Sequence, residues 1–145
     1  ELIPKFSPSH EIRLEQQRQE QAAAYPILLV EDNAVNQKVA KRQLEKFGFP
    51  VDVASNGCEA IAAIRHKHYA LVFMDIHMPE MDGFEATREI RKLENGGTRT
   101  TIVALTANTM QGDAEKCFEA GMDDFLSKPF KPEELKALVQ KWTGI

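Results

Sequence analysis

Short runs of apolar residues alternate with longer amphipathic segments from Ile27 onward. The apolar runs cover residues 27–30, 51–54, 70–74, 101–105 and 124–127. The segments between them are about 10 to 15 residues long and repeat their apolar positions at helical spacing. This alternation predicts about five βα units arranged around a parallel sheet.

The composition of the runs indicates where each strand lies in that sheet. The runs 27–30, 70–74 and 101–105 are almost continuously apolar, as expected for strands covered by helices on both faces. In the run 51–54, Val51 and Val53 flank Asp52, and this alternation favours an edge strand.

Each predicted helix carries an apolar face. The five faces comprise Val35, Val39, Ala40, Leu44 and Phe47; Cys58, Ile61 and Ile64; Ala86, Ile90 and Leu93; Ala114, Cys117 and Phe118; and Leu135, Leu138, Val139 and Trp142. Gly48 and Gly121 follow the first and fourth helices, where glycine is favoured, and Pro132 suits the first position of the last helix.

Residues 1–25 differ from the rest of the chain because they are rich in Glu, Gln and Arg and poor in large apolar side chains. This composition predicts a linker or a marginal helix, followed by one domain over residues 26–145. The chain begins at Glu1 rather than Met, so we expect a fragment of a longer protein or a processed product.

The composition excludes several classes of function. A chain of 145 residues, 43% hydrophobic, can bury one core without a disulfide or a structural metal. Its net charge of −4, without a clustered basic face, argues against nucleic-acid binding. No apolar run is long enough for a membrane contact, and Cys58 and Cys117 lack metal-site spacing. We expect a cytoplasmic setting, although the parent protein could be membrane-anchored.

Polar residues with chemical potential follow four of the predicted strands. They are Glu31 and Asp32, then Asp75, Thr106 and Lys128. Because the carboxyl ends of parallel strands meet at one edge, we expect these side chains to converge. Two carboxylates about 4 Å apart repel by about 4 kcal/mol at an effective dielectric constant of about 20, so a cation must share the site. An all-oxygen ligand set suits Mg²⁺.

The segments at these strand ends resemble the motifs of response regulator receiver domains over residues 27–143. The motifs are Glu31-Asp32-Asn33, the stretch 74–83 (MDIHMPEMDG), Thr106-Ala107 and Lys128-Pro129. The segments 32–36 (DNAVN) and 120–124 (AGMDD) most resemble receivers attached to hybrid sensor histidine kinases. The resemblance implies an α/β fold: a doubly wound, five-stranded parallel sheet with flavodoxin-like strand order 2-1-3-4-5 and helices on both faces.

The same resemblance assigns the acids. Asp75 is expected to be the nucleophile that becomes an aspartyl phosphate. Asp32 directly, Glu31 through water, Asp75 itself and the backbone carbonyl of His77 are expected to hold Mg²⁺. Two alternatives stay open, since Asp32 could cap the following helix and the His77 imidazole is expected to be solvated.

Further roles follow from the resemblance. Thr106 is expected to donate to the phosphoryl group and Lys128 to neutralise it, with a cis peptide between Lys128 and Pro129. Phe125 stands at the switch position that responds to Thr106, and the alternative of a core phenylalanine on a buried strand stays open for the unphosphorylated state. We also expect Gly83 to allow an unusual backbone turn.

These roles predict a phospho-accepting receiver of a two-component phosphorelay. It would take its phosphoryl group from the phosphodonor domain of a histidine kinase, then switch conformation or pass the group to a histidine phosphotransfer protein. The enzymatic steps expected of it are self-catalysed phosphotransfer and autodephosphorylation, and its parent protein could be a hybrid histidine kinase. Since no effector segment follows Ile145, we expect a relay role, with a possible dimer through the fourth to fifth helix face.

Three rivals remain open. An aspartate-nucleophile phosphohydrolase usually has a second acid two residues after the nucleophile, where this chain has His77. A flavodoxin-like binding module would show a Gly/Ser/Thr-rich loop after the first strand. A degenerate receiver, acting only as a protein-binding module, conflicts with the intact acids, Thr106 and Lys128.

Overall fold

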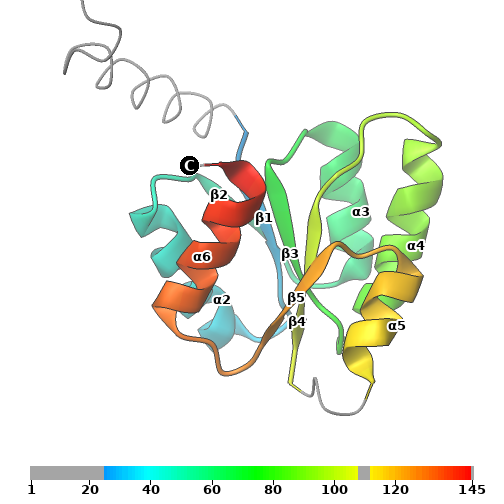
Figure 1. Ribbon diagram of the computed structural model, residues 1–145. Helices are drawn as coiled ribbons and strands as arrows, with labels where there is room; N and C mark the ends of the chain where they lie inside the picture. The colour runs from blue at the N-terminus through cyan, green and yellow to red at the C-terminus, as the bar shows by residue number, and fades with distance from the viewer. Residues whose placement is uncertain (1–24, 108–111, 145) are drawn as a thin grey trace, which may run out of the picture.

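A computed structural model describes residues 25–107 and 112–144 of the chain. Its centre is one parallel sheet with the strand order β2-β1-β3-β4-β5 (Figure 1). The strands are β1 (Ile27–Val30), β2 (Val51–Ala54), β3 (Leu71–Asp75), β4 (Ile102–Thr106) and β5 (Asp124–Ser127). The predicted topology is confirmed, including the edge position of β2.

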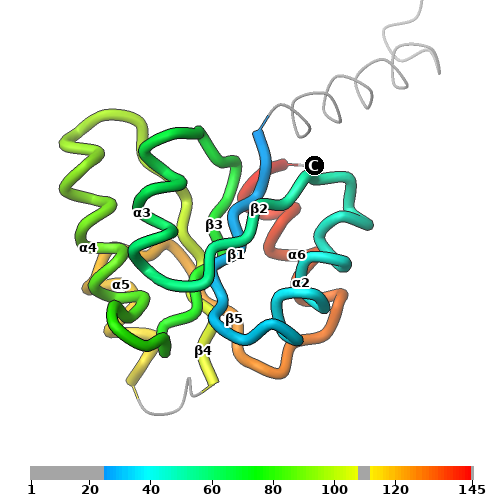
Figure 2. Tube along the Cα trace, turned by 180° about the vertical axis from the view of Figure 1, so that it is seen from behind, coloured from blue at the N-terminus to red at the C-terminus, as the bar shows by residue number. Residues whose placement is uncertain are grey.

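Helices cover both faces of the sheet. Figures 1 and 2 show α2 (Ala34–Lys46) and α6 (Pro132–Thr143) on one face. The other face carries α3 (Gly57–His66), α4 (Gly83–Glu94) and α5 (Asp113–Ala120). The sheet is therefore the middle of three layers.

Alternation along the central strands divides the core into two halves. On β3, Leu71 and Phe73 pack with α2 and α6, whereas Val72 and Met74 pack with α3, α4 and α5. All four side chains are fully buried. Continuous apolar sequence is needed here because both faces of the strand are covered.

The helix ends are set by local hydrogen bonds and by glycine and proline. Asn33, Asn56 and Asp82 cap α2, α3 and α4, each accepting a hydrogen bond from the N–H three residues on. The predicted helix ends at Gly48, Gly121 and Pro132 are confirmed: the two glycines adopt positive φ after α2 and α5, and Pro132 is at the start of α6.

Some predicted helix faces are wrong. Val35 and Val39 on α2 are 68% and 52% exposed, while Leu44 is buried. At about 100° per residue, Val35 lies about 180° around the helix from Leu44, so the predicted residues do not share one face. Cys58 is likewise exposed, since it lies on the opposite side of α3 from buried Ala60. Leu93 and Phe118 are also exposed.

The first described residues and the last turn of α6 lie at the same end of the molecule, opposite the carboxyl ends of the strands (Figures 1 and 2). Across residues 25–107 and 112–144, no helix combines the length and apolar composition needed to cross a bilayer. The linker or marginal helix expected at residues 1–25 lies, apart from Tyr25, outside the described residues.

Candidate functional site

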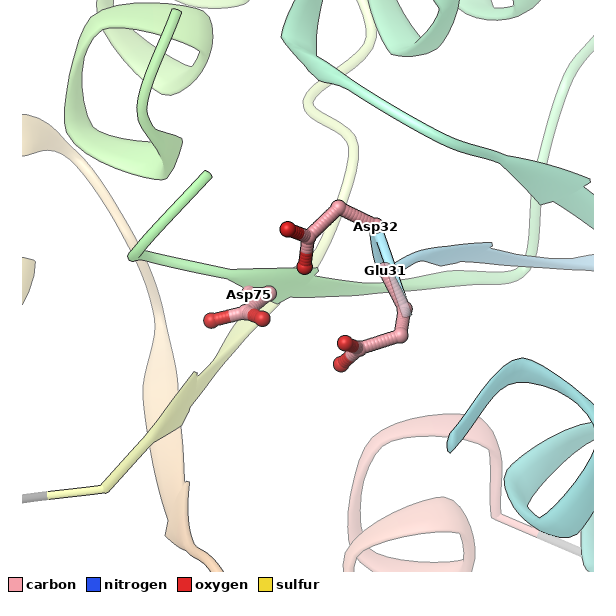
Figure 3. Close-up of side chains that lie close together, drawn as sticks. All are labelled: Glu31, Asp32 and Asp75. Atoms are coloured by element: carbon pink, nitrogen blue, oxygen red, sulfur yellow. The ribbon is translucent and has the colours of Figure 1, made fainter. Parts of the chain in front are cut away.

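Three carboxylates meet at the carboxyl edge of the sheet. Glu31 and Asp32 follow β1 directly, and Asp75 is the last residue of neighbouring β3. One oxygen from each lies within 4.8 Å of the others, and Figure 3 shows the side chains around a common space. Glu31 and Asp75 are buried, whereas Asp32 is exposed. The convergence expected of these acids is therefore present in the fold.

Lys128 directly follows the edge strand β5 and contacts two of these acids. Its ammonium donates to Glu31 Oε2 at 2.7 Å and to Asp75 Oδ2 at 3.1 Å. Its backbone N–H donates to the carbonyl of Thr106 at 2.7 Å, and its peptide bond to Pro129 is cis. Lys128 therefore belongs to the acidic cluster and is not an ordinary surface lysine.

The pKa values of the two buried acids, Asp75 and Glu31, are shifted in opposite directions. Burial raises the pKa of Asp75 above its ordinary value, although the His77 N–H and the Lys128 ammonium oppose the rise. Burial acts in the same sense on Glu31, but the hydrogen bond and charge of Lys128 lower the pKa of Glu31 below its usual value. Asp75 thus carries the less stable negative charge, because it is buried and is repelled by Glu31.

The cluster fits a small divalent cation. One ammonium faces three carboxylates, so further positive charge lowers the repulsion among them. Carboxylate and carbonyl oxygens with room for water are the ligand set that Mg²⁺ prefers.

Thr106 and Asp113 form a second contact beside the acids. The Thr106 hydroxyl donates to Asp113 Oδ2 at 3.1 Å, and both residues are buried. The sequence analysis missed Asp113, because an acid at the start of a helix is ordinary there and gives no functional signal. Nε2 of His77, whose side chain is 67% exposed, lies 3.8 Å from the same oxygen.

Phe125 is half-buried on β5. It packs against the core half that contains Met74, and its ring meets Phe118 edge to face with centroids 6.1 Å apart. Its side chain is thus neither fully in the core nor fully in solvent.

Two expectations are corrected, one at the junction of β1 and α2 and one in the loop between β3 and α4. Asp32 is not a helix cap, because Asn33 caps α2 and accepts from the Asn36 N–H at 3.0 Å. Gly83 does not adopt a positive φ; in this loop Glu80 does, at 70°. Gly83 is needed because a Cβ there would stand 2.5 Å from the Asp75 carbonyl oxygen.

The acids at the end of the AGMDD segment have structural partners. Asp123 accepts from Arg91 at 3.0 Å and from Arg99 at 2.8 Å. Asp124 accepts from Lys141 at 2.9 Å and from the Trp142 indole at 3.0 Å. These acids hold the fold together at a distance from the cluster formed by Glu31, Asp32 and Asp75.

Comparison with known proteins finds a consistent group of relatives. The family model of the response regulator receiver domain matches residues 27–140. A probable histidine kinase 1 of Oryza sativa subsp. indica is 40% identical over 146 residues, covering 80% of this chain and 15% of that protein. Hybrid signal transduction histidine kinase B of Dictyostelium discoideum is 46% identical over 119 residues, covering 75% of this chain and 6% of that protein. The chain therefore spans only a small part of these kinases.

Solved structures share the fold. The receiver domain of a sensor histidine kinase from Pseudomonas aeruginosa, with a magnesium ion in its active-site cleft, is 47% identical with a TM-score of 0.77. That similarity covers 85% of this chain and 100% of the other. The receiver domain of a Saccharomyces cerevisiae response regulator, crystallised with a histidine phosphotransfer protein, is 33% identical with a TM-score of 0.79, covering 84% and 90%.

Proposed function

This chain belongs to the response regulator receiver family, and we propose that it accepts a phosphoryl group from a phosphohistidine on Asp75. The observation that carries the proposal is the environment of Asp75. It is a buried carboxylate at a strand end, 3.1 Å from the Lys128 ammonium and next to two further acids. Such a site can neutralise a phosphoryl group as it arrives.

In the proposed step, a carboxylate oxygen of Asp75 attacks the phosphorus atom. A P–O bond forms while the P–N bond to the donor imidazole breaks, and the imidazole keeps the electron pair. Lys128 is the compact positive charge that faces the added oxygens. Thr106 would donate its hydroxyl to one of them.

The residues proposed to hold Mg²⁺ are Asp32, Asp75 and the backbone carbonyl of His77, with Glu31 acting through water. The oxygen cluster within 4.8 Å supports this set, as does the magnesium ion in the Pseudomonas receiver. The ion would offset the charge that builds up between carboxylate and phosphoryl oxygens. Glu31 also fixes the Lys128 ammonium through the 2.7 Å hydrogen bond.

Phosphorylation is proposed to shift an equilibrium between two conformations. Thr106 would move toward the phosphoryl group, and Phe125 would repack at the edge of the core. The half-buried position of Phe125 supports this role, because its ring can gain or lose packing at small cost. Asn108, at one end of the surface expected to respond, lies outside the described residues.

The proposed partners are a histidine kinase phosphodonor domain and a histidine phosphotransfer protein. Two comparisons support them: the curated relatives are histidine kinases, and the yeast receiver was crystallised with a phosphotransfer protein. The net charge of −4 supports the further proposal that this segment binds no nucleic acid. The exposed Phe118 on α5 supports a dimer contact through the face of α5 and α6.

A cytoplasmic location is also part of the proposal. Cys58 and Cys117 are both free thiols, as is typical of proteins in a reducing compartment.

Incubation with acetyl phosphate and Mg²⁺ tests the site. We expect one phosphoryl group per chain by intact mass, and none in Asp75→Asn. Asp82→Asn is the matched control: it removes a neighbouring loop acid and retains a good cap for α4, so labelling should persist. Label that survives in Asp75→Asn would reject the assignment.

The same experiment separates the rivals. Sustained hydrolysis of a phosphomonoester would indicate a phosphohydrolase, although the residue two positions after Asp75 is the exposed His77 rather than an acid. Failure of the wild-type chain to take any label would indicate a receiver that acts only through protein contacts. A yellow protein on purification would indicate a flavin-binding module.

A further inference from the structure

Asp113 lies beside the phosphoacceptor site without belonging to the acidic cluster. It is the first residue of α5 and is only 8% exposed, although it carries a carboxylate. Its Oδ2 accepts the hydroxyl of Thr106, whose exposure is 0%. The buried carboxylate of Asp113 thus accepts the hydrogen bond of the same Thr106 hydroxyl that would stabilise the proposed phosphorylated state.

Few groups stabilise the negative charge of the buried Asp113 carboxylate, and the Thr106 hydroxyl is one of them. Within the described part of the chain, its one ion-pair partner is His77 at 3.8 Å, a long contact that needs a protonated imidazole. Lys128, the cation of the cluster, pairs with Glu31 and Asp75. The Thr106 hydroxyl and the start of α5 are therefore the close stabilising groups around this buried carboxylate.

We propose that Asp113 is a positioning residue that restrains Thr106 in the unphosphorylated chain and so limits how readily Asp75 is phosphorylated. This inference rests on the proposed function of Asp75. The Thr106 hydroxyl has one proton, so it cannot be donated fully to Asp113 and to a phosphoryl oxygen at once. Thr106 must give up Asp113 before it can stabilise the phosphorylated state, and that exchange disfavours the state.

The central variant is Asp113→Ala, which removes the acceptor. We expect its phosphorylation by acetyl phosphate and Mg²⁺ to be about fivefold faster than that of the wild type, the effect of one modest hydrogen bond. Asp113→Asn keeps the shape and a weaker acceptor, so its rate should lie between those of Asp113→Ala and the wild type. Glu115→Ala removes an exposed acid from the same helical turn and should leave the rate unchanged.

A double-mutant cycle separates the restraint from simple loss of negative charge. Asp113→Ala is compared in the wild-type and Thr106→Val backgrounds, with circular dichroism to verify folding. If Asp113 acts through Thr106, its removal accelerates phosphorylation only where the hydroxyl is present. Equal acceleration in both backgrounds would overturn the proposal, because charge alone would then explain it.

A spectroscopic measurement tests the restraint without phosphorylation. The Thr106 methyl resonance of unphosphorylated Asp113→Ala should move toward its position in the phosphorylated wild type, as expected of a shifted population. A resonance that stays in place would overturn the restraint alone. If the wild-type chain takes no phosphoryl group on Asp75, the proposed function fails first, and the restraint with it.

Discussion

Gly83 is the residue whose size most directly limits the position of Asp75. A Cβ at Gly83 would stand 2.5 Å from the Asp75 carbonyl oxygen and 2.8 Å from the Ile76 Cα. Both atoms are backbone, so the start of α4 or the end of β3 would have to shift. We expect Gly83→Ala to lower the free energy of unfolding by about 1–3 kcal/mol, measured by urea denaturation, and to slow phosphorylation.

Gly57→Ala is the matched control for this prediction. Gly57 is also the first residue of its helix, but two of the three nearest atoms to its missing Cβ, at 2.9 and 3.0 Å, belong to the flexible Met81 side chain. That side chain can move aside, so the loss should be smaller. Equal losses in the two variants would mean that close backbone packing at Gly83 is not the cause.

At this scale, the sequence reveals acids at strand ends more readily than it reveals their neighbours. The meeting of Glu31, Asp32 and Asp75 follows from the parallel sheet alone, since the strands must end at one edge. The contact of Asp113 with Thr106 depends instead on how α5 packs, and no spacing rule encodes it. The requirement for Gly83 likewise arises from two backbones approaching each other.

At the scale of elements, Asp124 ties β5 to α6. Its carboxylate accepts from Lys141 and from the Trp142 indole, both in the last turns of α6. Although burial opposes ionisation, the Lys141 ammonium, the Phe125 N–H and the indole lower the pKa of Asp124 below its usual value. The folded state therefore binds a proton at Asp124 less readily than the unfolded chain does.

This depressed pKa sets the direction of a pH dependence. The stabilising contribution of Asp124 should be complete above its unfolded pKa and be lost as pH falls through the lower folded pKa. At neutral pH we expect Asp124→Asn to lower the free energy of unfolding by about 1 kcal/mol. Urea titrations should show this difference shrinking as pH falls from about 5 to about 3. A difference that is constant with pH would contradict the assignment.

The ends of β3 and β4 differ from the ends of the apolar runs that predict these strands. Apolar sequence predicts the runs 70–74 and 101–105, but β3 ends at Asp75 and β4 at Thr106. Asp75 pairs with Leu105 in the sheet, so hydrogen bonding carries each strand one residue beyond its apolar run. Asp75 and Thr106 are therefore held by pairing within the sheet. Apolar spacing also assigned Val35 to the buried face of α2, but Val35 is exposed. The rotation of the helix about its own axis decides which residues face the sheet, and the hydrophobicity of a single residue does not.

At the scale of the whole molecule, Mg²⁺ should act as a stabilising ligand. An ion that binds only the folded chain raises its free energy of unfolding by about 1.4 kcal/mol at ten times its dissociation constant. We expect urea unfolding to show this gain in the wild type and a loss of most of it in Asp32→Asn. Asp82→Asn, whose carboxyl caps α4 away from the cluster, should retain it. An equal gain in all three proteins would place the ion elsewhere.

The positions of the two ends of the described chain bear on how this receiver meets its partners. The start of β1 and the last turn of α6 lie at the end of the sheet opposite the carboxyl ends of the strands, and Asp75 is the last residue of β3 (Figure 1). Polypeptide joined at either end would therefore leave the domain at the end of the sheet opposite the proposed phosphoacceptor, Asp75. A domain attached only at that end can rotate about its linker and present the carboxyl edge of its sheet to a donor and to an acceptor in turn.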